Sequence, residues 1–586
     1  MVSRIFDIPF HYHSKFPKEN ALAAKVNGEW VLYSTADFIR NANSVSCGLM
    51  KLGLQKGDKV AIISNNRPEW NFADIGMQQI GVVNVPIYTT LSETEIAFIL
   101  NDCEAKAIFV SDGALLKKIL KVKESVPSLK EIFTFELIAG ARHWKELLIQ
   151  PDGADLDQLS KIKDSVQASD LATLLYTSGT TGTPKGVMLA HSNIVSNVLA
   201  SEKLCPVDSR HKALSFLPLC HSYERMLTYL YMYIGVSIYY AETMDTIADN
   251  LKEVKPELFS TVPRLLEKTY DKITKKGAEL TGIKKLLFFW ALDLGLRYEM
   301  HKKNGFFYEA QLKLANKLIF SKWREALGGN IRVIVSGGAA LQPRLARVFW
   351  AANIYVLEGY GLTETSPVIS VNNLEPGGAM FGTVGTVIKN VQVSIAPDGE
   401  ILCKGPNVMM GYYKRPDLTA EAIDKDGWFH TGDIGVMIDN RYLKITDRKK
   451  EIFKTSGGKF IAPQALENKF KESPFIEQIM VVGEHKNFAA ALVVPSFAHL
   501  RSWCELKGIP DGSNEELINN PEVISRIEKE IKEYNLSFGK TVQLKKIKLL
   551  PKEWTTESGE LTATLKLKRK IIAERNAKLI DEIYSG

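Results

Sequence analysis

Short apolar runs alternate with longer amphipathic stretches in the first part of the chain. Runs of strand length occur at 59–64, 82–86 and 107–110, and stretches of helix length lie between them at 70–80 and 94–102. This alternation is typical of a layered α/β protein. We therefore predict a large α/β unit, composed of several subdomains, that begins near the N-terminus.

The pattern changes near the end of the chain. Apolar runs at 479–483 and 490–495 precede a helical region at 515–534, which indicates a small, separate α+β unit. We place the boundary in a charged, glycine-containing stretch, so that residues 1–449 form one domain and residues 450–586 form the other.

Two apolar regions require an explanation. The longest uncharged run, Met226 to Ala241, has 16 residues and contains Gly235, whereas a membrane-spanning helix needs about 20. We predict a buried helix there that turns into a strand at 236–240. Residues 265–327 form a long helical stretch, and the pattern alone favours helices packed on a core over an apolar ligand channel.

The composition excludes several classes of protein. Hydrophobic residues make up 45% and charged residues 24% of the 586 residues, a balance that excludes disordered, collagenous and coiled-coil chains. A net charge of +7 is small for this length and disfavours a nucleic-acid-binding protein. The six cysteines form no C-x-x-C pair, which argues against disulfides and zinc. With no signal-peptide pattern at the start, we expect a cytoplasmic protein.

The strongest local motif is Tyr176-Thr-Ser-Gly-Thr-Thr-Gly-Thr-Pro-Lys-Gly, bracketed by strand and helix signals. Its small residues let backbone N–H groups approach an anion, its hydroxyls add donors, and Lys185 adds a positive charge. A Walker A loop is excluded because Pro184 precedes this lysine and Gly186 follows it. The motif predicts a phosphate-binding loop of another type.

This loop resembles the signature of the adenylate-forming enzymes, which include acyl-CoA synthetases, firefly-type luciferases and nonribosomal adenylation domains. Four further blocks of that family follow in the expected order, at 336–341, 359–365, 427–433 and 447–452. The resemblance covers essentially the whole chain. It implies a large N-terminal domain for ATP and the acyl substrate, followed by a small, mobile C-terminal domain.

Adenylation joins a carboxylate to the α-phosphate of ATP, so the site must neutralise several phosphate charges. The resemblance places the adenine between the 337–339 backbone and the ring of Tyr360, the ribose hydroxyls on Asp433 and Arg448, and the α-phosphate on Thr363. The complete set of nucleotide-binding residues that it implies is Thr177, Ser178, Gly179, Thr180, Thr181, Gly182, Lys185, Gly337, Gly338, Ala339, Tyr360, Gly361, Thr363, Asp433, Arg448 and Lys566.

The metal and the mobile domain have their own predicted residues. The resemblance makes Glu364 the Mg²⁺ ligand with Thr177 as a hydroxyl partner, and Mg²⁺ does take few protein oxygens when phosphates supply the rest. It also makes Lys450 the hinge of a domain rotation between the two half-reactions. After that rotation, the loop 456–458 would approach the thiol of coenzyme A.

The sequence offers two candidates for the catalytic lysine, because the family's common Gly-Lys context is absent. The block Gly559-Glu-Leu-Thr-Ala-Thr-Leu-Lys-Leu-Lys-Arg resembles the variant of long-chain acyl-CoA synthetases, in which the K-x-x-R spacing selects Lys566 with Arg569. Lys568 is the alternative, since two lysines at this spacing could shift in register. Lys185 and His221 complete the predicted catalytic group.

Basic residues are concentrated close to this lysine. Residues 540–570 carry nine Lys and Arg against three Glu. Three interpretations stay open: a solvated basic face, a contact for the 3'-phosphate of coenzyme A, and a contact with an anionic membrane at the inner face of the cell.

The acid is inferred from three features of the sequence and its acceptor from a fourth. His221-Ser-Tyr-Glu-Arg-Met resembles the H-x-x-E-R-M block of long-chain acyl-CoA synthetases, where the histidine lies beside the carboxylate. Together with the lysine variant and the helical insertion at 265–327, it points to a fatty acid. The 20 residues after Lys566 leave no room for a carrier domain, so free coenzyme A is the expected acceptor.

Three alternatives remain open from the sequence. The first is a ligase that passes the acyl-adenylate to a separate acyl carrier protein. The second is a luciferase-like monooxygenase, against which the His221 block argues. The third is a catalytically silent binding protein, which would have no need of Lys566, Glu364 and Arg448 together.

Overall fold

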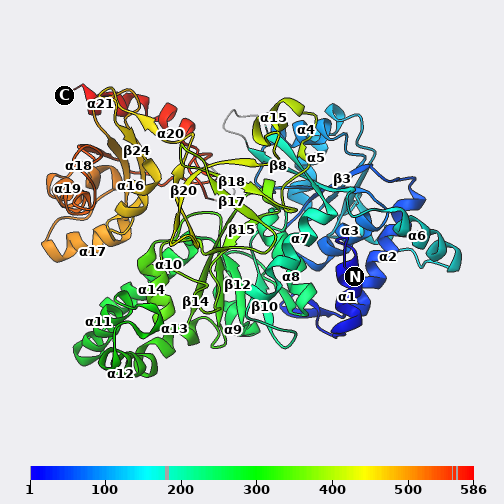
Figure 1. Ribbon diagram of the computed structural model, residues 1–586, viewed down its shortest axis with the longest axis horizontal. Helices are drawn as coiled ribbons and strands as arrows, with labels where there is room; N and C mark the ends of the chain where they lie inside the picture. The colour runs from blue at the N-terminus through cyan, green and yellow to red at the C-terminus, as the bar shows by residue number, and fades with distance from the viewer. Residues whose placement is uncertain (1, 179–183, 557, 563–564, 586) are drawn as a thin grey trace.

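The computed structural model describes residues 2–178, 184–556, 558–562 and 565–585. Figure 1 shows the N-terminal elements on the right, the C-terminal elements at the upper left, and the rest of the chain between and below them. The layered α/β architecture with a smaller C-terminal α+β unit agrees with the prediction.

The first sheet has eight strands, and its central strands run parallel. The predicted runs at 59–64, 82–86 and 107–110 form three of these central strands, which are apolar because both faces of the sheet are covered. Across the sheet the order is β19 (Gly411–Tyr412), β9 (Pro184–Ala190), β8 (Leu171–Ser178), β4 (Val83–Ile87), β3 (Lys59–Ile63), β5 (Ala107–Val110), β6 (Glu131–Thr134) and β7 (Arg142–His143).

The helices around this sheet begin where the sequence supplies capping residues. Pro68 opens α3 (Pro68–Gln79), and Ser92 with Glu95 forms a capping box at α4 (Glu93–Asp102), close to the predicted bounds. The other helices of this part are α1 (Asp7–Lys15), α2 (Thr35–Lys51), α5 (Gly113–Val122), η1 (Lys123–Ser125), η2 (Trp144–Leu147), α6 (Gly153–Ser165), α7 (His191–Ser201) and η3 (Glu202–Leu204).

The phosphate-loop motif lies in a different local structure from the one expected. It joins two antiparallel strands, β8 and β9, and the following helix α7 begins only at His191. The expectation that strand and helix signals bracket the motif directly is therefore wrong. The second strand forms because Val187 and Leu189 are buried and pair with β8.

The second sheet has thirteen strands and supplies most of the cleft described below. Its strands β10 to β14 run parallel, and antiparallel strands extend it at the β14 side. The order is β17 (Gln392–Ile395), β18 (Glu400–Lys404), β20 (Phe429–Ile438), β21 (Tyr442–Arg448), β16 (Thr386–Val387), β15 (Val368–Val371), β14 (Tyr355–Gly361), β13 (Val333–Ser336), β12 (Leu258–Thr261), β10 (Lys212–Ser215), β11 (Ser237–Tyr240), β1 (Leu22–Val26) and β2 (Glu29–Tyr33).

Helices on and beside this sheet include the one predicted from the uncharged run. That helix, α8 (Ser222–Ile234), ends at the left-handed Gly235 and is followed by β11, as predicted. The remaining helices are α9 (Ile247–Val254), α14 (Pro343–Ala351), η6 (Thr363–Thr365) and α15 (Pro416–Ala422). Across the described residues, no helix is both long and apolar enough to cross a membrane.

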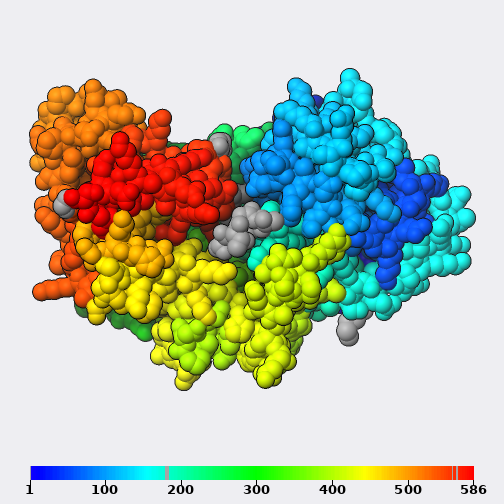
Figure 2. All heavy atoms as spheres, turned by 90° about the horizontal axis from the view of Figure 1, so that it is seen from above, coloured from blue at the N-terminus to red at the C-terminus, as the bar shows by residue number. Residues whose placement is uncertain are grey.

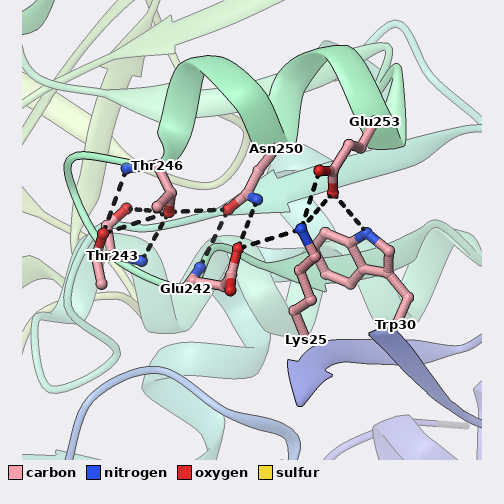
Figure 3. Close-up of polar contacts among 7 residues, drawn as sticks. All are labelled: Lys25, Trp30, Glu242, Thr243, Thr246, Asn250 and Glu253. Atoms are coloured by element: carbon pink, nitrogen blue, oxygen red, sulfur yellow. Dashed lines mark hydrogen bonds and ion pairs between the residues drawn. The ribbon is translucent and has the colours of Figure 1, made fainter. Parts of the chain in front are cut away.

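A polar network attaches the hairpin β1–β2 to α9 (Figure 3). The ammonium group of Lys25 lies 2.9 Å from a carboxylate oxygen of Glu253 and 3.5 Å from one of Glu242. The indole N–H of Trp30 donates to Glu253 at 3.1 Å, and Asn250 donates to Glu242 at 3.1 Å. This network fixes the edge of the large sheet.

The stretch 265–327 is helical, as predicted. It contains most of α10 (Pro263–Ala278) and all of α11 (Gly282–Leu296), η4 (Met300–Lys302), α12 (Phe306–Ala315), η5 (Asn316–Phe320) and α13 (Ser321–Ala326). Phe288, Leu294 and Phe320 pack on the core.

The C-terminal unit has its own apolar core. Its three-stranded sheet consists of β24 (Ile476–Val482), β25 (Ala490–Pro495) and β26 (Lys546–Leu549), where β25 pairs with both neighbours. A separate hairpin joins β22 (Phe453–Lys454) to β23 (Phe460–Ile461). The helices are α16 (Pro463–Phe470), α17 (Phe497–Lys507), α18 (Asn514–Asn519), α19 (Pro521–Asn535), α20 (Arg569–Arg575) and α21 (Ala577–Tyr584).

Candidate active site

A cleft of about 2460 Å³ lies between the large α/β body and the C-terminal unit. Figure 2 shows the orange to red portion of the C-terminal unit and the blue to cyan portion of the large body on opposite sides of a hollow. The segments that follow the parallel strands β10, β12, β13 and β14 all contribute to its wall. The carboxyl ends of parallel strands are the usual ligand-binding edge of an α/β sheet.

The turn after β13 and the end of β14 form one wall of the cleft. Gly337, Gly338 and Ala339 line it together with Tyr360. Gly338 has a φ of +82°, a conformation that glycine adopts without strain. A Cβ atom on Gly361 would lie 1.7 Å from the carbonyl oxygen of Pro367, so only glycine fits there.

A hydrogen-bonded triad lies beside this wall. The hydroxyl of Tyr360 donates to Asp433 at 2.7 Å, and the guanidinium of Arg448 donates to the other oxygen of Asp433 at 3.1 Å. Asp433 and Arg448 face each other directly in the register of β20 and β21. The arrangement presents an acceptor and a forked donor side by side, which suits a diol.

The carboxylate of Glu364 lies in the cleft and contacts β19, which pairs with the phosphate-loop strand β9. It accepts a hydrogen bond from the hydroxyl of Tyr412 at 2.9 Å, and the ammonium of Lys185 lies 5.1 Å from the centre of that tyrosine ring. Thr177 is opposite Lys185 in the β8–β9 register, and both line the cleft. The described residues contain no group of three carboxylate, histidine or cysteine side chains that could hold a metal alone. One carboxylate and a hydroxyl fit Mg²⁺ that arrives with phosphates.

The loop residues Gly179, Thr180, Thr181 and Gly182 lie outside the described residues. Ser178 is the last residue of β8. Thr363 lies in the short helix η6, and its hydroxyl is 3.3 Å from that of Ser222 at the start of α8.

His221 caps α8 with its ring. The Nδ1 atom accepts the backbone N–H of Tyr223 at 3.1 Å, which assigns the remaining ring proton of the neutral form to Nε2. Burial, with a smaller contribution from the charge of Lys566, lowers the pKa of His221 to about 4. The neutral ring can therefore donate a hydrogen bond from Nε2 at physiological pH.

Lys566 reaches the cleft from the C-terminal unit, next to the groups just described. Burial and then the charge of Arg448 lower its pKa to about 8, while Asp433, Glu451 and Glu364 act in the opposite direction. These charges come from both sides of the cleft. The lysine therefore experiences charges from both parts of the chain.

Polar contacts hold the segment that carries Lys566, both at residues before it in the chain and at residues after it. Its backbone N–H donates to the hydroxyl of Thr562 at 3.0 Å. Downstream, Arg569 forms ion pairs with Glu451 at 2.9 Å and with Glu467 at 2.6 Å. Lys568 also lines the cleft, at the residue that precedes α20.

The pKa of Lys566 gives a pH prediction. If its positive charge supports adenylation, the charge is present below pH 8 and is lost as the pH rises through about 8. The kcat/KM for ATP-dependent pyrophosphate release should therefore fall above pH 8. A profile that stays flat to much higher pH, or one that keeps its falling limb in Lys566→Ala, would contradict this.

Lys450 lies in the turn after β21, between two residues that are held by different parts of the chain. Lys449 forms ion pairs of 2.7 Å with Asp398 and Glu400 of the large body. On the other side, Glu451 accepts from Arg569 of the C-terminal unit. Lys450 thus lies between a residue paired with the body and a residue paired with the C-terminal unit.

Two segments that the sequence analysis linked to the reaction, 456–458 and 265–327, lie largely outside the cleft wall in this conformation. The loop 456–458 is part of the β22–β23 hairpin and is absent from the described cleft wall. From the stretch 265–327, only Glu267 and Lys268 reach the cleft among the described residues. Among the described residues, that stretch therefore contributes no apolar side chain to the cleft wall.

The apolar part of the cleft wall comes from α8 and its neighbour. Met226, Leu227 and Leu230 line it at helical spacing, and Leu204 and Cys205 line it from the segment after α7. The sequence indicated a buried helix here, but its 3.6-residue periodicity does not reveal which buried face adjoins a cavity.

Two further cleft residues were missed by the sequence reasoning. Tyr412, the partner of Glu364, occurs in no pattern that indicates a site. Glu358 lies on β14 two residues before Tyr360, and burial raises its pKa to about 8. Its place immediately before Gly359-Tyr-Gly-Leu-Thr-Glu-Thr was the only available signal.

Comparison with known proteins agrees with this geometry. The AMP-binding enzyme family matches residues 11–413, and the AMP-binding enzyme C-terminal domain matches residues 450–586. Among similar proteins, the long-chain-fatty-acid–CoA ligase FadD15 of Mycobacterium bovis is 34% identical over 96% of this chain and 93% of its own. Human long-chain-fatty-acid–CoA ligase 1 is 36% identical over 91% of this chain and 80% of its own.

A solved structure shows the same fold. The adenylation domain of a carboxylate reductase from Mycobacterium chelonae superposes with a TM-score of 0.76, at 20% identity, over 100% of this chain and 91% of its own. Because the family match spans more than half of the sequence and its site residues converge on one cleft, this chain belongs to the AMP-binding enzyme family.

Proposed function

We propose that this protein is an AMP-forming long-chain fatty acid:CoA ligase. The observation that carries the proposal is the convergence in one cleft of Lys566, Glu364, the Asp433–Arg448 pair and a neutral His221, next to an apolar wall. The relatives named as long-chain-fatty-acid–CoA ligases, which match nearly the full chain, support it.

The first half-reaction joins the fatty acid to AMP. A carboxylate oxygen attacks the α-phosphorus of ATP, the bond to the β-phosphate oxygen breaks, and pyrophosphate leaves with the bonding electrons. Lys566, Lys185 and the Nε2–H of His221 would stabilise the negative charge that develops. Mg²⁺, held by Glu364 and Thr177, would neutralise phosphate charge.

The nucleotide would lie along the wall from β13 to β21. We assign the adenine to Gly337, Gly338, Ala339, Tyr360 and Gly361, and the ribose hydroxyls to Asp433 and Arg448. Thr363 would contact the α-phosphate, and the loop residues 177–182 with Lys185 would bind the β- and γ-phosphates. The facing donor and acceptor at the triad support the ribose assignment.

The acyl chain would extend along α8. Met226, Leu227 and Leu230 offer an apolar surface, and Leu204 and Cys205 add to it from the other side. Burying the methylene groups of a fatty acid there contributes about 0.8 kcal/mol for each CH₂. This surface supports a long aliphatic acid over a small or aromatic acid.

The second half-reaction forms the thioester. The thiol of coenzyme A loses its proton and attacks the acyl carbonyl, and AMP leaves with the electrons of the broken carbon–oxygen bond. We propose that residues 450–586 rotate about Lys450, which removes Lys566 and brings the loop 456–458 to the cleft. The separate anchoring of Lys449 and Glu451 supports this hinge.

A rigid hinge residue should separate the half-reactions. Lys450→Pro fixes one backbone dihedral, so we expect thioester formation to fall by about tenfold or more while pyrophosphate release in the first turnover persists. Rapid-quench measurement of acyl-AMP and acyl-CoA would test this. Lys450→Ala, which leaves the dihedral free, is the matched control, and an equal loss in both variants would refute the hinge.

The function itself is tested by product analysis. The protein should be incubated with ATP, Mg²⁺, coenzyme A and a mixture of short, long and aromatic carboxylic acids, and the products identified by mass spectrometry. We expect long-chain acyl-CoA with AMP and pyrophosphate. ADP would exclude adenylation, and acyl-AMP without thioester would favour the ligase that serves a separate acyl carrier protein.

A peripheral membrane position is part of the proposal. Long-chain fatty acids partition into bilayers, so an enzyme that binds at the surface would meet its substrate there. Among the described residues, no helix is long and apolar enough to cross a membrane. We propose that side chains at the surface of the protein make this contact.

A further inference from the structure

An apolar surface lies on two helices far from the cleft residues. The helices α11 and α12 run antiparallel, since the hydroxyl of Tyr308 donates to the carbonyl of Leu294 at 2.6 Å and the indole of Trp290 donates to Gln311 at 3.4 Å. Figure 1 shows them at the lower left edge of the molecule.

Large apolar side chains on these helices face solvent. Phe306 and Phe307 are 81% and 82% exposed, and Ile283 and Leu286 are 75% and 72% exposed. We define the α11–α12 face as these four residues with the half-exposed Leu314 and Leu318.

The residues of this face are distributed along one antiparallel helix pair, with Ile283 and Leu286 at the start of α11 and Phe306 and Phe307 at the start of α12. Phe307, Leu314 and Leu318 recur at seven and eleven residues on α12 and its continuation, so they share one side of that helix. The bond from Trp290 to Gln311 places the Ile283 side of α11 against it. Large exposed apolar side chains gathered on one helix pair mark an interaction site.

Positive charge surrounds the face. Between 272 and 318 there are ten Lys and Arg against four Asp and Glu. Two of the four acids are already paired, Asp293 with Arg297 and Glu299 with Arg347, and no lysine of this segment forms an ion pair within the described chain. The lysines are 272, 275, 276, 284, 285, 302, 303, 313 and 317.

This charge distinguishes between two occupants. A second copy of the chain, docked through a twofold axis, would place the lysines of one face against those of the other, which is repulsive. A bilayer with anionic headgroups offers an apolar interior and a negative surface, and that surface attracts each exposed lysine.

We propose that the α11–α12 face docks this protein on anionic lipid bilayers. Phe306, Phe307, Ile283 and Leu286 enter the boundary between headgroups and acyl chains, and the surrounding lysines contact phosphate groups. This inference goes beyond the proposed ligase activity, because it depends on the surface alone.

Vesicle co-sedimentation of the full chain tests the docking. The wild-type protein should pellet with vesicles of phosphatidylcholine and phosphatidylglycerol, and much less with phosphatidylcholine alone. Replacing Ile283, Leu286, Phe306 and Phe307 by serine should lower the bound fraction by about tenfold or more. Lys284→Glu with Lys285→Glu should weaken binding and reduce its salt dependence.

The matched control uses exposed apolar residues on the C-terminal unit. Leu506 and Leu536 are 85% and 83% exposed, and their replacement by serine should leave vesicle binding unchanged. Activity on a shorter, water-soluble fatty acid without vesicles should be equal in all variants, which shows that each is folded.

Three results would overturn the docking proposal. They are a wild-type protein that stays in the supernatant with anionic vesicles, a fourfold serine variant that binds as well as wild type, and a dimer in sedimentation velocity that the fourfold variant abolishes. A failure to form any acyl-CoA would reject the proposed function instead, because the vesicle measurement contains no substrate.

Discussion

Replacement of Lys566 by alanine is expected to lower the rate of acyl-adenylate formation by about 10²- to 10³-fold. The side chain is buried and lies in the electrostatic field of Arg448, Asp433 and Glu364, and alanine would leave this position without its positive charge. Pyrophosphate release in a single turnover would measure the loss.

The second half-reaction should respond differently. In the proposed domain rotation Lys566 leaves the cleft before thioester formation, so we expect Lys566→Ala to retain most of the rate of transfer from synthetic acyl-AMP to coenzyme A. An equal loss in both half-reactions would refute the assignment.

Lys568→Ala is the matched control for this experiment. Both lysines line the cleft, but Asp433, Glu451 and Glu364 act on the charge of Lys566. We expect the Lys568 variant to adenylate at close to the wild-type rate. The reverse result would assign the catalytic role to Lys568.

The second large effect is expected from a buried ion pair behind the active site. Arg225 and Asp74 are 1% and 0% exposed and lie 2.6 Å apart. The guanidinium also donates to Tyr229 and Thr173 at 2.7 Å each. Arg225→Met leaves the carboxylate buried without its cation, which should lower the free energy of unfolding by about 3–5 kcal/mol.

The partners of Asp74 explain why this loss cannot be repaired locally. Gln78 and Asn84 each donate to it at 2.6 Å, so the charge is held inside a network that joins α3, β4 and α8. Urea unfolding would measure the change. The double variant Asp74→Leu with Arg225→Met removes both charges and should lose less than the sum of the single variants.

A control variant with a less buried ion pair completes this prediction. Arg347→Met removes a partly exposed ion pair with Glu299 and should cost about 1 kcal/mol or less. Thr173 lies on the strand that leads to Thr177, and Arg225 lies one turn after His221. An Arg225→Met variant as stable as wild type would show that the pair does not hold these elements together.

The sequence predicted the fold class well because its apolar runs have the lengths of buried strands. The segments at 59–64, 82–86 and 107–110 are nearly uninterrupted, and buried parallel strands need no polar face. The phosphate motif was recognisable for a related reason, since close approach to an anion requires small residues in an unbroken run.

The same reasoning failed where the environment of a segment was decisive. The stretch 265–327 has the periodicity of helices, and both a core and an exposed face satisfy that pattern. Phe306 and Phe307 are exposed in the structure, whereas Phe320 is buried. The next strand after the phosphate loop was also missed, because Val187 and Leu189 read equally well as part of a helix.

The sequence by itself determined the family, the order of the blocks and the chemical types at the site, since these depend on residues that are adjacent in the chain. Only the tertiary structure decided which lysine is surrounded by the charges of the cleft, which buried charges are paired, and which apolar face adjoins a cavity. Glu364, Asp433 and Lys566 are far apart in sequence, and their mutual field exists only after the two parts of the chain have packed together.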